Sequence, residues 1–161
     1  MHKLLSVVLC IILVFSVGSI SLAAEPIDEL GVIENDPYGD YASSPIYNEM
    51  TLRAASPTIQ TWYNGVTRVN SGTIRLTSYT SCAAVATKIS VSYNLQRSTN
   101  NSSWSSYYTT SGSKSSSSAY SGSIDKAIAT GYYYRVVTTH YSYSGSTLVS
   151  TKSATSGSLY F

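Results

Sequence analysis

A period-two pattern of side chains runs through the chain from Thr58 onward and constrains its fold more than any other feature. The clearest alternation covers residues 85–96. Its apolar positions are Val85, Ile89, Val91, Tyr93 and Leu95, and its polar positions are Lys88, Ser90, Ser92, Asn94 and Gln96. Because successive side chains of a β-strand point to opposite faces, this run predicts a strand with one buried face.

Turn dipeptides divide the rest of this region into further short strands. Asn64-Gly65 predicts a type I′ hairpin between strands at residues 58–63 and 66–70, since both residues accept positive φ angles. Other strands are expected at residues 73–80, 104–110, 117–124, 132–143, 147–155 and 159–161. About seven or eight short strands without a visible helix predict an all-β domain, built as a two-layer antiparallel β-sandwich.

The first residues have the features of a secretory signal peptide. Lys3 precedes an apolar run at residues 4–17, and small residues follow as far as Ala24. This run is too short to span a bilayer, so we expect cleavage after Ala23 or Ala24 and a mature protein without a transmembrane anchor. The sequence thus predicts three parts: a signal peptide at residues 1–24, a flexible acidic segment at residues 25–56 and the β-sandwich domain at residues 57–161.

Opposite charges separate the acidic segment from the domain. Residues 25–50 carry seven acids and no base, whereas from Thr51 onward nine Lys and Arg stand against one acid, Asp125. Three prolines and the lack of a sustained hydrophobic period favour a flexible conformation for the acidic segment. Its charge leaves two roles open: a pro-segment that masks the basic domain, or a spacer that holds the domain away from a surface.

The shortage of acids also removes most catalytic chemistry. One carboxylate cannot provide the pair that general acid–base catalysis uses, nor a carboxylate cage for a metal ion. Phosphate-binding, metalloprotease and nucleophile-elbow motifs do not occur. Cys82 and His140 are formally available as a nucleophile pair, but a cysteine flanked by alanines is typical of a buried core residue. We therefore expect no enzyme activity, no catalytic residue, no cofactor and no metal.

Two stretches of the domain resemble known β-sandwiches. Residues 89–97 followed by Ser103-Trp104, and residues 131–136, are similar to the C, C′ and F strands of fibronectin type III and immunoglobulin-like domains. The order of these motifs, with His140 after them, also resembles a group of uncharacterised small secreted proteins of Gram-positive bacteria over residues 73–155. The resemblance implies a fold and secretion, and it implies no reaction.

The composition of the domain, rich in Tyr, Ser, Thr and Asn, is that of surfaces that bind ligands. In residues 132–143 the even positions make the better core face, so the odd positions point outward. If this strand lies beside the strand at residues 85–96, the outward residues of both share one surface. The candidate ligand-binding residues are Trp104, Tyr133, Arg135, Tyr141, Asn94 and Gln96. An ordinary solvent face rich in Ser, Thr and Tyr is the alternative interpretation.

These features predict a secreted, extracellular, non-enzymatic binding or surface-interaction module that is a monomer. A cell-wall polymer, a glycan or a protein is the expected partner. Nucleic acid is not expected, because no two bases are adjacent after Met50 and an exported protein rarely meets nucleic acid. The alternative function is a small exported antibacterial or toxin-like protein with an acidic pro-segment.

Overall fold

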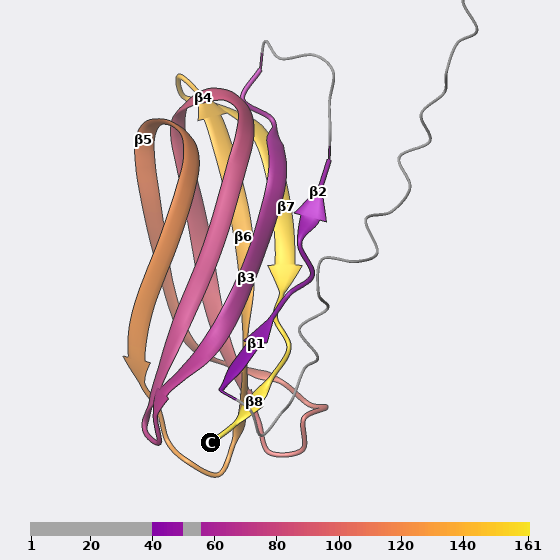
Figure 1. Ribbon diagram of the computed structural model, residues 1–161, viewed down its shortest axis with the longest axis vertical. Helices are drawn as coiled ribbons and strands as arrows, with labels where there is room; N and C mark the ends of the chain where they lie inside the picture. The colour runs from indigo at the N-terminus through magenta and orange to yellow at the C-terminus, as the bar shows by residue number, and fades with distance from the viewer. Residues whose placement is uncertain (1–39, 50–55) are drawn as a thin grey trace, which may run out of the picture. The chain divides into compact units, whose positions relative to one another are not determined.

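The computed structural model describes residues 40–49 and 56–161, which form eight β-strands and no helix (Figure 1). The strands are β1 (Tyr41–Ser43), β2 (Tyr47–Asn48), β3 (Ile59–Asn70), β4 (Thr73–Ser98), β5 (Ser105–Ala127), β6 (Tyr133–Ser144), β7 (Thr147–Thr155) and β8 (Leu159–Tyr160). The prediction of an all-β protein is confirmed. The predicted signal peptide lies outside the described residues. Within the described part of the chain, no helix is long and apolar enough to span a membrane.

All eight strands belong to one antiparallel sheet, and β4 organises it. The order is β1-β3-β4-β6-β7, with β2 paired to β3, β5 to β4 and β8 to β6. One edge of β4 pairs with β3 over residues 73–82 and then with β6 over residues 88–98, while β5 pairs along its other edge. The immunoglobulin-like or fibronectin-like topology stays a prediction.

β4 and β5 each turn back on themselves, near their labels at the top of Figure 1. In β4 the pairing with β5 shifts between Ser81 and Ala86. Val85 lies within this bend and is 67% exposed, whereas Ala86 is buried. The prediction that Val85 belongs to the inner face is therefore wrong, because the bend interrupts the alternation that Ile89 resumes.

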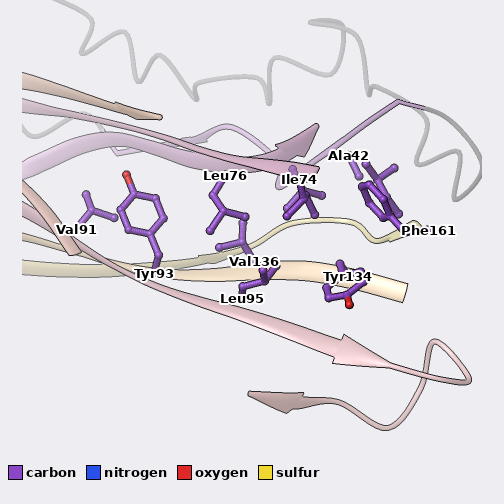
Figure 2. Close-up of a cluster of buried hydrophobic side chains, with 11 residues drawn as sticks. Ala42, Ile74, Leu76, Val91, Tyr93, Leu95, Tyr134, Val136 and Phe161 are labelled. Carbon is purple, nitrogen blue, oxygen red and sulfur yellow. The ribbon is translucent and has the colours of Figure 1, made fainter. Parts of the chain in front are cut away.

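The bend brings the two parts of β4 to a common core. Ile74 and Leu76 from the first part pack in the same buried cluster as Val91 and Leu95 from the second part (Figure 2). Tyr93 lies in this cluster as well, and its Oη is 2.6 Å from Ser78 Oγ of the first part. The inner face predicted for Ile89, Val91, Tyr93 and Leu95 is confirmed, because all four side chains are buried.

Asn64 and Gly65 do not form the predicted hairpin, because β3 runs straight through them. The Asn64 side chain is fully buried, and its Nδ2 donates to the carbonyl oxygens of Val136 and Ala154, at 3.2 and 2.9 Å. A Cβ at Gly65 would lie 3.0 Å from the Tyr41 hydroxyl. Long-range packing therefore determines this dipeptide's conformation, and its local turn preference is overridden.

Part of the predicted flexible segment joins the sheet. Within residues 40–49, the strands β1 and β2 pair with β3. Ala42 is fully buried, and the Tyr47 ring stacks on Trp62 with centroids 5.2 Å apart. The prediction of flexibility is wrong for these residues, since backbone pairing and buried contacts hold them in place.

The remaining turns and strands follow the sequence more closely. Turns at Ser71-Gly72 and at Gly145 connect β3 to β4 and β6 to β7, between strands that the sequence predicts. β8 lies within the strand predicted at residues 159–161 and pairs with the start of β6. The Ser- and Gly-rich stretch at residues 111–116 differs from prediction, because it continues β5 instead of separating two strands.

Candidate functional site

The outward face of β4 and β6 gathers five of the six predicted site residues. Gln96 pairs with Arg135, Asn94 with Val137, Ser98 with Tyr133, and Ser90 with Tyr141. Side chains of directly paired residues point to the same face of a sheet. The predicted residues of the two strands therefore share one surface, as expected from their alternation.

Trp104 reaches this surface from the segment that precedes β5. The Arg135 guanidinium carbon lies 4.2 Å from the centroid of the Trp104 ring, and Arg135 Nε donates to Gln96 Oε1 at 2.8 Å. Burial lowers the pKa of Arg135, although an arginine stays protonated in proteins. Trp104 and Gln96 thus hold the half-buried guanidinium group of Arg135 in a defined plane. We call Arg135, Trp104 and Gln96 the Arg135 site.

The other predicted residues lie around or away from the Arg135 site. The Tyr133 ring lies 4.9 Å from the ring of Tyr160, and Asn94 Oδ1 accepts a hydrogen bond from Ser106 Oγ at 2.7 Å. Tyr141 is six residues beyond Arg135 on β6, which corresponds to about 20 Å along the strand. A single compact site therefore cannot include Tyr141.

Acids are paired with other bases, and none is paired with Arg135 among the described residues. The three ion pairs are Asp40 with Arg68 at 3.3 Å, Asp125 with Arg75 at 2.6 Å, and Glu49 with Lys152. Further bases stack on rings: Arg97 on Tyr107 and Tyr132, Lys126 on Tyr108, and Lys88 on Tyr143. In the described part of the chain, only Gln96 accepts a hydrogen bond from the Arg135 side chain.

Cys82 and His140 do not form an activated thiol. The ring nitrogens of His140 have threonine partners, Nδ1 with Thr80 Oγ1 at 2.7 Å and Nε2 with Thr138 Oγ1 at 2.8 Å. Burial raises the pKa of Cys82 to about 11 and lowers the pKa of His140 to about 4. Since the thiolate is the reactive form, Cys82 is a core residue that stays protonated near neutral pH.

Two features lie beyond what sequence reasoning found. The contact of Trp104 with Arg135 joins a loop residue to a strand residue, and no periodicity signals it. Lys88 lies above the Tyr143 ring, with Nζ 5.9 Å from the centroid. A signal for this second contact existed, because Lys88 and Tyr143 both occupy outward positions of predicted strands.

Within residues 40–49 and 56–161, no three His, Cys, Asp or Glu side chains gather where they could hold a metal ion.

Comparison with known proteins found no matching family model, curated protein or solved structure.

Proposed function

We propose that this chain is a secreted, extracellular, non-enzymatic binding module that holds an anionic group of its ligand at the Arg135 site. The observation that carries the proposal is the Arg135 guanidinium itself, fixed by Trp104 and Gln96 without a carboxylate partner among the described residues. A guanidinium presents a planar fork of donors that matches a carboxylate or phosphate. Because Gln96 accepts from Nε, the terminal nitrogens remain for the ligand.

The surroundings of the Arg135 site support recognition of a ligand. Tyr133 and Trp104 offer aromatic area with few rotatable bonds, and Asn94 offers adaptable hydrogen bonds. Secretion is proposed from the signal-like residues 1–24. The proposed scaffold is a two-layer sandwich of the immunoglobulin or fibronectin type III kind, and the common core of the two parts of β4 supports it.

Binding to an immobilised acidic polysaccharide tests this function. The purified chain is passed over polygalacturonate, with neutral dextran as the reference surface. Replacing Arg135 by Gln should weaken binding by about tenfold or more, because a charge-assisted bidentate contact contributes about 1.5–3 kcal/mol. Arg135→Lys should weaken binding less, since it keeps the charge and loses the fork.

Lys114 supplies the matched control for this test. It is exposed and lies on β5, and Lys114→Gln removes one positive charge away from the Arg135 site. Nearly unchanged binding of this variant would show that the loss at Arg135 is local. Equal losses in the Arg135→Gln and Lys114→Gln variants would mean that net charge alone drives binding, and the proposal would then be wrong.

The alternative function, a small exported antibacterial or toxin-like protein with an acidic pro-segment, has one observation in its favour. Asp40 and Glu49 of the acidic segment pair with Arg68 and Lys152 of the domain. Such contacts are what masking of a basic body requires. Growth inhibition by a chain that begins at residue 51, and none by the chain that keeps residues 25–50, would favour this alternative.

A further inference from the structure

The outward surface of β6 continues beyond the Arg135 site and ends at a second cation. Its outward positions are Tyr133, Arg135, Val137, Thr139, Tyr141 and Tyr143, which we call the β6 stripe. All six are half-buried. Lys88 of β4 pairs with Tyr143 and holds its ammonium group over that ring. One cation therefore lies near each end of the β6 stripe.

The spacing of these two cations follows from the strand register. Gln96 is opposite Arg135, and Lys88 precedes Gln96 by eight residues on the same strand. The pairing of β4 with β6 shows no shift between these positions. At about 3.3–3.4 Å per residue, the two cations are roughly 27 Å apart along the strand.

Between the cations the surface carries rings and hydrogen-bonding groups. Tyr141 lies on β6. On the neighbouring strand β4, Ser92 is opposite Thr139 and Asn94 is opposite Val137. The described acids are all engaged elsewhere, as the ion pairs above show. Within the described residues, the fixed charge along the β6 stripe is therefore positive only.

The backbone of β6 is not available to a partner. β4 pairs with one edge of β6 and β7 with the other. An extended peptide therefore cannot add a strand at this position, and recognition must come from side chains. Aromatic faces that alternate with hydroxyl and amide groups suit sugar rings, which present an apolar face and a rim of hydroxyls.

We propose that the β6 stripe binds an extended acidic polysaccharide that lies along β6, with one carboxylate at Arg135 and another at Lys88. This inference rests on the proposed function, and it adds the class of ligand, its direction on the protein and its minimum length. An oligomer must span roughly 27 Å to reach both cations. Contact with the second cation is then intramolecular, so the affinity should rise steeply at that length.

Oligogalacturonates graded in length test the inference by isothermal titration calorimetry. The unsubstituted chain should bind oligomers that span both cations at least tenfold more tightly than oligomers that reach only one. Lys88→Gln should remove this gain and leave the binding of short oligomers unchanged. Arg135→Gln should weaken short and long oligomers alike, and Lys114→Gln should behave like the unsubstituted chain.

The outcomes separate the inference from the function on which it rests. Short and long oligomers that bind equally, with Lys88→Gln without effect, would overturn the inference and leave the Arg135 site intact. If the unsubstituted chain bound no oligomer of any length, both the inference and the proposed function would be overturned. Tighter binding of polyglutamate of the same span would identify a peptide as the ligand and exclude the polysaccharide. Circular dichroism checks that each variant is folded, and Arg135→Lys replaces Arg135→Gln if that variant unfolds.

Discussion

His140 lies in the core with its ring nitrogens on the hydroxyls of Thr80 and Thr138, and Asn64 Nδ2 donates to the same Thr138 hydroxyl at 2.9 Å. These four side chains are fully buried and come from β3, β4 and β6. Hydrogen bonds between buried polar groups offset the free-energy cost of removing these groups from water. The network has no acid near the imidazole among its members, so nothing in it stabilises a protonated ring.

The stability of the fold should therefore depend on pH through His140. Burial lowers its pKa in the folded state to about 4, against about 6.5 in an unfolded chain. Between these values the unfolded state binds more protons, so stability is fully present above about pH 6.5 and is lost as the pH falls through 4. We expect a loss of about 3 kcal/mol across this window, measured by urea unfolding at pH 7, 5.5 and 4.

His140→Gln is the control for this pH dependence, since glutamine keeps hydrogen-bonding groups at the site and does not titrate. This variant should be less stable at pH 7 but should lose much less stability between pH 6.5 and 4. The same slope in both proteins would show that other groups cause the pH dependence.

At the scale of the residue, sequence reasoning succeeded where local alternation decides the outcome. Arg135 and Gln96 were placed on one face because each occupies an outward position of a strand. The turn predicted at Asn64 is wrong because the preference of asparagine for a turn is local, whereas the carbonyl partners of Asn64 lie on β6 and β7. A single sequence contains no information on those distant partners.

At the scale of the element, β4 and β5 are longer than any strand that the sequence predicts, at 26 and 23 residues. Their bends explain the difference. The alternation of residues 85–96 predicts an inner face that includes Val85, and the Ser- and Gly-rich composition of residues 111–116 predicts a connection between strands. In the structure these residues continue β5, and Gly112 leaves room for the Tyr120 ring from its other part. Composition shows where small side chains occur. It does not distinguish a loop from a strand whose small side chains leave room for a neighbouring ring.

Gly112 provides a test of this space. Tyr120, from the later part of β5, reaches across so that a Cβ at Gly112 would overlap its hydroxyl. Gly112→Ala should therefore destabilise the fold by about 1–3 kcal/mol, the usual cost of overpacking. Tyr120→Phe in the same chain removes the overlapping oxygen and should restore much of this loss, as a double-mutant cycle by thermal unfolding would show.

Gly72→Ala is the comparison for this pair, because no atom lies closer than 3.9 Å to a Cβ at that position. It should change stability little. If Gly112→Ala were equally neutral, the close approach of Tyr120 would not exist in solution.

At the scale of the whole molecule, the segment at residues 40–49 covers an edge of β3 that would otherwise expose unpaired backbone groups. The sequence did not reveal this role, because the charge of the acidic segment favours solvation while its buried contacts depend on β3. Uncovered strand edges promote association between chains. The monomer expected from the sequence should therefore depend on this cover.

Ala42 and Ile46 make a matched pair for testing the cover. Ala42 of β1 is fully buried beside Val66 of β3, whereas Ile46 is 54% exposed. Ala42→Asp should displace the segment, because burying an unpaired carboxylate is costly, and should produce concentration-dependent association in size-exclusion chromatography with light scattering. Ile46→Asp adds the same charge and should remain a monomer. Identical behaviour of the two variants would contradict the covering role.

The hairpin of β4 and β5 also has a consequence for how the chain folds. The connecting loop is organised by Asn100, whose Oδ1 accepts from Ser98 Oγ and from the amides of Ser102 and Ser103, at 2.9, 3.0 and 2.8 Å. Pairing that starts beside this loop closes the shortest chain segments first and can then proceed like a zipper, at a small entropic cost for each step.

The same two strands continue around the bend, but their register shifts between Leu95 and Gln96, close to this loop, and again between Ser81 and Ala86. A slip of one residue there would turn inward side chains outward along the strands. Folding that starts at this polar loop would therefore order Val91 and Leu95 of the second part of β4 first, whereas Ile74 and Leu76 take their register only beyond the bend.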